Sequence, residues 1–404
     1  MTFTDELDVA GEGVNQTRRS RRPKPPPDWQ PHIDTERGVA VIALETPPRE
    51  DDAVRHAFLK LLETQGFDMA LWGIRDDEIE VRTYEVPIGG EQVHRVWYYK
   101  ARIVRTRSKA DLSELLDDIR RHKPRKLPPP GGPYTYHLCL ADWQLGKRDY
   151  ETTNEVTARI RGIPDQVIRH VSQLKRVGFD IGEIVVAGMG DLLEGCTGFY
   201  PSQQFQVELD GREQARVARR LVVHLVKHVA PLAASLRVVA VPGNHGEKRQ
   251  NGAAVTGPGD NTDLEVFDQV AEVLAENPER YGHVRFHIPR DETSVLIETG
   301  GQWVGYTHGH IPGFRGSVLP MGRVWEWWKG QAHGGQPVGD ASVLVAGHFH
   351  HFAALEQGTR TYLQCPTLDA GSQWFTDRHG YASRPGTLSF LTGPEGLSHI
   401  QVHR

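Results

Sequence analysis

Residues 185–195 read VVAGMGDLLEG, a short apolar run that leads directly into a glycine-bounded loop carrying Asp191. The apolar run predicts a buried strand, and the glycines after it predict a tight turn. Four further stretches share this layout: LCLADWQLG (138–146), VVAVPGNHGE (238–247), VGYTHGH (304–310) and LVAGHFHH (344–351). Because strand ends that feed short loops bring distant side chains to one edge of a sheet, we expect the polar residues of these loops to form one site.

The polar side chains at these strand ends are carboxylates, amides and imidazoles, with no cysteine among them: Asp142, Gln144, Asp191, Asn244, His245, His308, His348 and His350. Oxygen and nitrogen donors of this kind suit hard or borderline divalent metals. Taken alone, a Gly-Asp pair is ordinarily a turn, and a histidine near a strand end is ordinarily a hydrogen-bonded surface residue. The ordered set predicts a metal site with donors enough for two ions.

Apolar runs alternate with amphipathic helical patterns from about residue 134 onward, which predicts an α/β or mixed layered domain. The expected strands cover residues 136–141, 184–187, 236–241, 295–298, 304–307 and 343–346. The expected helices have apolar faces at residues 160–174, 217–229 and 264–274. No internal repeat is visible. The length of 404 residues predicts a large domain and a smaller one.

The first third of the chain predicts a separate organisation. Residues 1–32 combine glycine, proline and arginine with little apolar periodicity, which predicts a disordered basic tail. Residues 33–119 predict a small α+β domain, 120–133 a basic Pro/Gly linker, and 134–404 the domain with the site. Within the small domain, a helix ending near Gly66 precedes a hairpin of residues 79–86 and 93–104, an order compatible with a winged-helix-like module.

The second hairpin strand, VHRVWYYKARIVR, interleaves basic and aromatic side chains, as a nucleic-acid surface would. Aromatic residues in strands are also ordinary packing residues, and basic tails are also simply solvated, so both readings stay open. The net charge of -5 argues against indiscriminate binding of nucleic acid by the whole surface but does not describe local patches. We expect a cytoplasmic protein without a membrane partner, since the sequence shows neither a long apolar segment nor the layout of a signal peptide.

The ordered motifs resemble those of the calcineurin-like metallophosphoesterase superfamily: D-x-H, G-D, G-N-H-[DE], a histidine beside glycine, and G-H-x-H. The matching residues are Asp142–Gln144, Gly190–Asp191, Gly243–His245, His308–His310 and Gly347–His350. The resemblance covers about residues 135–356 and implies a sandwich of two mixed sheets flanked by helices. The chain also looks like metallophosphoesterases of actinobacteria and their bacteriophages, some of which are similar to the nuclease subunit of double-strand-break repair complexes.

The resemblance implies a dinuclear centre bridged by Asp191. One ion would be held by Asp142, Gln144, Asp191 and His350, and the other by Asp191, Asn244, His308 and His348. A metal-bound hydroxide would be the nucleophile, and His245 would protonate the leaving oxygen or neutralise charge in the transition state. The histidines His310 and His351 are expected on the rim of the site rather than among the ligands.

Two positions depart from the family pattern. Gln144 stands where histidine is usual, which should weaken that metal position and favour manganese or magnesium over zinc. Mn²⁺ is therefore the expected ion, with Mg²⁺, Zn²⁺ and iron as alternatives. An inserted glycine also moves the acidic residue of the third motif to Glu247, which is one candidate to orient His245. Glu194 could reach the rim of the site or cap a helix, and Lys147 and Arg148 could meet substrate phosphates.

The motifs predict phosphate-ester hydrolysis without defining the substrate. The basic tail, the linker and the hairpin favour nucleic acid, so a DNA nuclease is the leading hypothesis. A phosphodiesterase for small nucleotides or a phosphoprotein phosphatase is the alternative among enzymes, and a catalytically silent scaffold is the alternative of another class. The sequence leaves open DNA against RNA, exonuclease against endonuclease, a separate ATPase partner and the oligomeric state.

Overall fold

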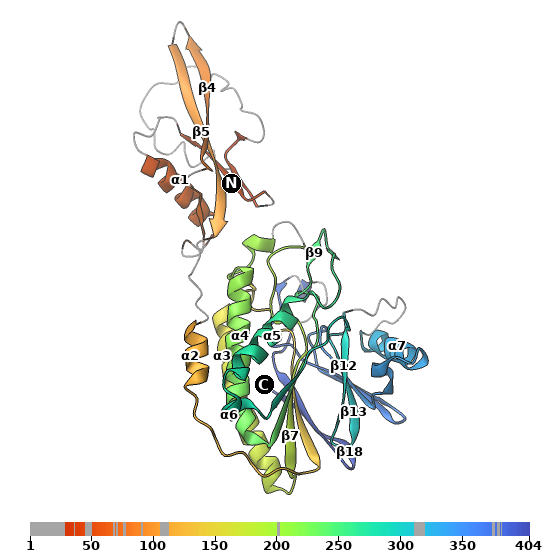
Figure 1. Cartoon of the computed structure of the whole chain (residues 1–404). Helices are drawn as coiled ribbons and strands as arrows, with labels where there is room; N and C mark the ends of the chain where they lie inside the picture. The colour runs from red at the N-terminus through yellow and green to blue at the C-terminus, as the bar shows by residue number, and fades with distance from the viewer. Residues whose placement is uncertain are drawn as a thin grey trace. The chain divides into compact units, whose positions relative to one another are not determined.

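The computed structural model describes residues 29–404 except residues 36, 45–50, 68, 70–71, 76–77, 90–91, 106–112, 200–202, 311–319, 374–375, 378–379 and 381. The chain divides into two compact units, Met1–Lys109 and Ala110–Arg404 (Figure 1). Among the helices of the described part, none is long and apolar enough to cross a membrane.

The first unit is an antiparallel sheet with a helix packed on it. The strands are β1 (His32–Asp34), β2 (Val39–Leu44), β3 (Trp72–Ile74), β4 (Glu80–Gly89) and β5 (Gln92–Arg105), and the helix is α1 (Asp51–Thr64). β5 is central and pairs with β2, β3 and β4. The predicted helix and hairpin are both present, with Phe58 and Leu62 of α1 fully buried. The winged-helix-like comparison stays a prediction.

The folded part of the first unit begins earlier than predicted. Trp29 was expected in the disordered tail, but its side chain is only 1% exposed. The guanidinium of Arg82 lies 4.3 Å from its ring centroid, and the ammonium of Lys100 lies 5.8 Å away. Burial of the indole together with these cation–π contacts holds residues 29–32 against the sheet. The rest of the predicted tail, residues 1–28, lies outside the described residues.

The boundary between the units also differs from the predicted one. Helix α2 (Ser113–Arg120) was expected in the small domain, but it belongs to the second unit. Leu115 and Ile119 are buried in the main core of that unit. The side-chain amide of Asn277 donates to the carbonyls of Ile119 (2.9 Å) and His122 (2.8 Å). Residues of the predicted linker are therefore attached to the second unit.

The second unit contains two mixed sheets. The first has the order β11 (Val284–His287), β8 (Ser235–Ala240), β7 (Ile181–Gly188), β6 (Tyr134–Leu140), β17 (Thr387–Gly393), β18 (Gly396–His403). The second has the order β12 (Ser294–Thr299), β13 (Gln302–Thr307), β14 (Val343–Ala346), β16 (Arg360–Gln364), β15 (Ala353–Gln357). The strands β11, β8, β7 and β6 are parallel, as are β13, β14 and β16. β9 (Arg249–Gln250) and β10 (Ala253–Ala254) form a separate two-stranded ribbon.

The two sheets stack face to face with helices on both outer sides (Figure 1). The helices are α3 (Thr153–Arg176), α4 (Gly211–Val229), α5 (Thr262–Ala275) and α6 (Pro278–Tyr281) on the first sheet, and α7 (Pro320–His333) on the second. Side chains alternate along β6: Leu138 and Leu140 pack with the helices, whereas Cys139 packs between the sheets. This arrangement confirms the predicted sandwich of two mixed sheets flanked by helices.

Local sequence explains where the two long helices begin. Thr152 caps α3 by accepting from the backbone N–H of Glu155, and the Glu155 carboxylate accepts from the N–H of Thr152. Asp210 and Glu213 make the same reciprocal pair at the start of α4. Such capping boxes satisfy N–H groups that have no partner within the helix. Both helices therefore begin at a defined residue and cover the first sheet.

The position of α2 predicts the outcome of truncation. A fragment of residues 121–404 should be less stable than one of residues 110–404 by about 2–5 kcal/mol, because two apolar side chains leave the core. Urea unfolding of the two fragments measures this difference. Asp117→Ala in the longer fragment is the control, since this carboxylate is exposed. Equal stability of the two fragments would contradict the assignment of α2 to the second unit.

Candidate metal centre

The predicted site residues follow strand ends that lie in register. Leu140 pairs with Gly188 and Gly188 pairs with Ala240, so β6, β7 and β8 end side by side. In the second sheet Thr307 pairs with Ala346, so β13 and β14 also end together. Across the sandwich, the backbone N–H of His348 donates to Asp142 Oδ2 at 3.0 Å. The five loops meet at one edge of the sandwich, as the sequence predicted.

Several predicted ligands have a backbone conformation that is unusual for residues with a side chain. Positive φ angles occur at Asp142 (53°), Gln144 (44°), Asp191 (54°), His348 (71°) and His350 (60°). Only Asn251 and His399 share this property among the other non-glycine residues of the described part. Each such conformation costs on the order of 1–3 kcal/mol and is found where the surroundings hold a functional group in place.

Glycines allow the loops to touch through their backbones. A Cβ at Gly243 would lie 2.2 Å from both the backbone nitrogen and Oδ1 of Asp191. At Gly190, which has a φ of +84°, a Cβ would lie 2.8 Å from His308 Nδ1. A side chain at either position would therefore push Asp191 or His308 out of place. These two glycines of the predicted motifs are required by close approach.

Donor atoms converge around Asp191. His308 donates from Nδ1 to the carbonyl of Met189 at 2.7 Å, which directs Nε2 into the centre. That Nε2 lies 3.1 Å from Asp191 Oδ2 and 3.1 Å from Asn244 Oδ1. Asp191, His308 and His348 each offer a donor atom, and these atoms lie within 4.8 Å of one another. Such a cluster of carboxylate, amide and imidazole donors fits a divalent ion.

Asp142 contributes an oxygen that lacks a hydrogen-bond donor. Its Oδ1 is buried and has no hydrogen-bond partner among the described residues. The nearest imidazole nitrogens are His350 Nε2 at 3.5 Å and His308 Nε2 at 4.0 Å. A buried carboxylate oxygen without a donor is costly, and a bound cation would remove that cost. This oxygen fits the metal predicted from the sequence.

The charges in the centre favour a cation. Burial disfavours a charged His308, but the carboxylates of Asp191 and Asp142 outweigh burial and raise the pKa of His308 to about 10. An ion bound beside these carboxylates would take the place of the proton on Nε2. Burial alone would raise the pKa of Asp191, but His308 and His245 outweigh it and hold that pKa below its ordinary value. For His348, burial and the neighbouring His308 lower the pKa, so this imidazole stays neutral and able to ligate.

Asp263 fastens two of the loops, and sequence reasoning missed it. Its Oδ2 accepts from the N–H groups of Asp191 (2.8 Å) and Gly243 (3.1 Å), and its Oδ1 accepts from Leu192 (3.0 Å). Burial and the Asp191 charge raise the pKa of Asp263 to about 6. Residues 261–263 signal only a helix start, since Asn261 caps α5. Nothing in the local sequence indicates that the Asp263 carboxylate bonds to the backbone of Asp191.

His245 is oriented by Glu194 rather than by Glu247. Its Nδ1 donates to the carbonyl oxygen of Glu194 at 2.7 Å, and Glu194 Oε2 lies 3.7 Å from the same nitrogen. Its ring stacks on Phe199 at 4.6 Å, and its Nε2 lies 4.0 Å from Asp191 Oδ2. The alternative in which Glu247 orients His245 is wrong, because Glu247 instead pairs with Arg249 and with His310 Nε2 at 3.2 Å.

A cavity of about 650 Å³ opens beside the centre, and its lining includes Gln144, Lys147, Glu194, Phe199, His245 and His350. Gln144 Oε1 accepts from the ammonium of Lys147 at 2.9 Å, and Lys147 also donates to Asp369 Oδ2 at 2.7 Å. Asp369 was not among the predicted residues. His351 lies outside this lining and donates from Nδ1 to the carbonyl of Phe349 at 2.7 Å.

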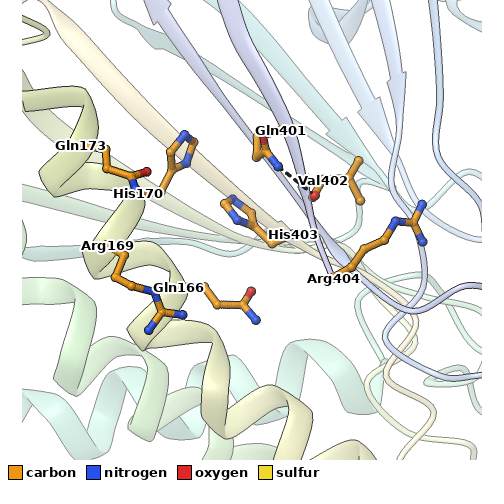
Figure 2. Close-up of a pocket in the computed structure, with 8 residues that line it drawn as sticks. All are labelled: Gln166, Arg169, His170, Gln173, Gln401, Val402, His403 and Arg404. Atoms are coloured by element: carbon orange, nitrogen blue, oxygen red, sulfur yellow. Dashed lines mark hydrogen bonds between the residues drawn. The ribbon is translucent and has the colours of Figure 1, made fainter. Parts of the chain in front are cut away.

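A second cavity, of about 460 Å³, lies between α3 and β18, and its lining side chains are drawn in Figure 2. His170 and His403 face each other there with ring centroids 5.0 Å apart. The Tyr136 hydroxyl lies 3.2 Å from His170 Nδ1 and 3.4 Å from His403 Nε2. Burial lowers the pKa of both histidines, that of His403 to about 4. These neutral rings pack the edge of the sheet, and the lining contains none of the predicted site residues.

No protein-family model and no curated protein matches the chain. Similar solved structures include a Vps29 single mutant from Entamoeba histolytica, with 12% identity, a TM-score of 0.30, and coverage of 67% of this chain and 99% of that one. A predicted phosphoesterase from Streptococcus pneumoniae TIGR4 has 12% identity, a TM-score of 0.28 and coverage of 67% and 98%. A novel archaeal phosphodiesterase has 10% identity, a TM-score of 0.30 and coverage of 66% and 99%. The case for a phosphoesterase therefore rests on this chain's own motifs and geometry.

The role of Asp263 predicts the effect of its replacement. Asp263→Asn should lower the free energy of unfolding by about 1–3 kcal/mol. Both carboxylate oxygens accept from backbone N–H groups, and the amide would replace one of these acceptors with an NH₂ group that faces a backbone donor. Urea unfolding measures this change. Asp268→Asn, on the exposed side of the same helix, is the matched control and should stay within about 0.5 kcal/mol of the parent. Equal effects of the two changes would contradict the fastening role.

Proposed function

We propose that the second unit is a metal-dependent phosphoesterase that acts on the phosphodiester bonds of nucleic acid. The observation that carries the proposal is the convergence of Asp191 Oδ2, Asn244 Oδ1 and His308 Nε2 next to His245. Metal donors of this type beside an imidazole are the parts that phosphate-ester hydrolysis needs. The ordered motifs at the strand ends support the same reaction.

Two groups of residues would hold the ions. Asp191, Asn244, His308 and His348 form one group, and Asp142, Gln144 and His350, together with Asp191, form the other. A bound ion would supply positive charge that activates a water molecule and neutralises the phosphate oxygens. Manganese suits this donor set best, because carboxylate and amide oxygens accompany the imidazoles and no thiolate takes part.

His245 would be the catalytic acid. Its Nδ1–H is used by the Glu194 carbonyl, so its Nε2 is the nitrogen that faces the centre. A proton on Nε2 could pass to the oxygen that leaves phosphorus. The Glu194 carboxyl group, 3.7 Å from Nδ1, would stabilise the imidazolium form of the ring. Phe199 stacks on this ring and limits its rotation.

Basic side chains support a nucleic-acid substrate. Lys123, Arg125 and Lys126, in the segment predicted as a basic linker, are all exposed. In the first unit, the exposed Arg95 places its guanidinium 6.0 Å from the ring centroid of the partly exposed Trp97. Cations with neighbouring aromatic rings suit a polyanion. We therefore propose that the first unit, whose winged-helix-like character is part of this hypothesis, contacts nucleic acid.

A small-substrate phosphodiesterase is the second candidate, and the size of the cavity favours it. A volume of about 650 Å³ lies within the range of small-molecule sites. A single nucleotide could then be the whole substrate. A phosphoprotein phosphatase would use the same metal donors. These candidates differ from a nuclease in substrate and not in reaction type.

Loss of a metal donor predicts loss of hydrolysis. With Mn²⁺, the parent protein should cleave end-labelled linear DNA and bis(p-nitrophenyl) phosphate. Asp191→Ala should reduce kcat/KM for the diester more than about 100-fold. Replacement of a residue that only supports a metal ligand typically costs about 10-fold to 100-fold, and loss of the ligand itself should cost more. Asp165→Ala, an exposed carboxylate on α3, is the control. Diester cleavage without DNA cleavage would support the small-substrate enzyme, and no hydrolysis of either would support a scaffold.

The orientation of His245 predicts a second kinetic effect. Glu194→Gln should lower kcat for the diester about 10-fold to 100-fold with little change in KM, because the neutral amide no longer stabilises the charged ring. Steady-state kinetics in Mn²⁺ measure both constants. Glu247→Gln is the matched comparison, since this residue pairs with His310 and Arg249. A larger loss in Glu247→Gln than in Glu194→Gln would contradict the proposed role.

A further inference from the structure

Lys147 is a built-in cation beside one of the two metal positions. Its ammonium donates to Gln144 Oε1 at 2.9 Å and to Asp369 Oδ2 at 2.7 Å. The side chains of Lys147 and Asp369 are 15% and 5% exposed, respectively. Gln144 and Lys147 line the cavity that His245 and His350 also line. The ammonium is thus held in the site and is not a mobile surface charge.

Asp369, the anchor of this lysine, is itself tied to the metal loop. Its Oδ2 accepts from the N–H of Gly371 at 2.8 Å, and its backbone N–H donates to Thr367 Oγ1 at 3.0 Å. The hydroxyl of Thr367 donates in turn to the carbonyl of Asp142 at 2.9 Å. A largely buried ion pair adds little to stability compared with apolar side chains of similar size. The position of the Lys147–Asp369 ion pair beside Gln144 therefore points to a role in the site.

The lysine conflicts with a full second metal position. Gln144 Oε1 is the donor that this position needs, and it already accepts from a cation. A divalent ion bound to the same oxygen would lie close to the ammonium and be repelled by it. The remaining donors at this position would be Asp142, His350 and the bridging Asp191. At the other position Asn244 Oδ1 lies 3.1 Å from His308 Nε2, a nitrogen that can release its proton and bind the ion itself. The Lys147 ammonium has only donors and cannot become a ligand in this way.

We propose that the centre holds one tightly bound divalent ion, at Asp191, Asn244, His308 and His348, and that the Lys147 ammonium supplies the second positive charge for the substrate phosphate. The inference rests on the proposed function. An ammonium has three N–H donors, and two are used by Gln144 and Asp369. Among the described residues these two are its acceptors, so the third N–H can donate to a phosphate oxygen in the cavity. The glutamine at position 144, where the family pattern has histidine, then serves to accept a hydrogen bond from this lysine.

The number of bound ions tests the proposal. In the full chain, calorimetric titration with Mn²⁺ should give one tight ion, and electron paramagnetic resonance should give the spectrum of an isolated ion. The variant Gln144→His/Lys147→Met/Asp369→Asn removes the ion pair and restores an imidazole. It should bind a second ion at least about 10-fold more tightly than the parent and give the spectrum of an exchange-coupled pair. Lys175→Met is the control, because that ammonium donates to the carbonyl of Leu232 away from the cavity.

Inorganic phosphate tests the charge that Lys147 supplies. In the Mn²⁺-loaded protein, Lys147→Met/Asp369→Asn should raise the Kd for phosphate about 10-fold or more, and Lys175→Met should leave it unchanged. An unchanged Kd in the double variant would overturn the role of the lysine. Circular dichroism checks that each variant is folded, and if a variant unfolds, the metal content of the parent decides. Two ions of similar affinity in the parent would overturn the inference alone, whereas no bound ion would overturn the proposed function as well.

Discussion

The carboxylate of Asp263 is the contact on which the geometry of the centre depends. It accepts hydrogen bonds from the backbone N–H groups of Asp191, Leu192 and Gly243, and so joins the loop after β7 to the loop after β8. The residue sits in the first turn of α5, which packs on the first sheet, where Phe267 fills the space over Gly188. A helix packed on the sheet therefore sets the position of Asp191. The energetic cost of burying the charge is offset by three hydrogen bonds.

This fastening explains how a strained centre can persist. The positive φ angles at Asp142, Asp191 and His348 are unfavourable for residues with side chains, and repulsion among buried carboxylates adds to that cost. Hydrogen bonds between loops oppose both effects: the His348 N–H reaches Asp142, and the His245 N–H reaches Asp191 Oδ1 at 2.8 Å. The loops are thus held by each other's backbones as well as by the strands. A bound cation would add to the same balance by neutralising the carboxylates.

Residues next to strand ends could be predicted from sequence, because the pattern is local. A buried strand, a glycine turn and a polar residue occur within a few positions of Asp142, Asp191 and His348, and parallel strands in register bring such loops together. The supporting contacts have no local signal. Asp263 lies 72 residues from the Asp191 N–H that it accepts, and Asp369 lies 222 residues from Lys147. In the same way α2 was misplaced, because its attachment depends on Asn277, 158 residues from Ile119.

Gln144 stands where the family pattern has histidine, and its contacts in the fold give this difference a physical reason. In the sequence, the glutamine only removes an imidazole from a motif. In the structure, its Oε1 faces an ammonium that is held by Asp369, a residue of the segment between β16 and β17. A neutral histidine has one acceptor nitrogen with a single lone pair, so a nitrogen that accepted from Lys147 could not also bind a metal ion. An amide oxygen accepts instead, so glutamine, lysine and aspartate form a set in which each residue makes the other two compatible.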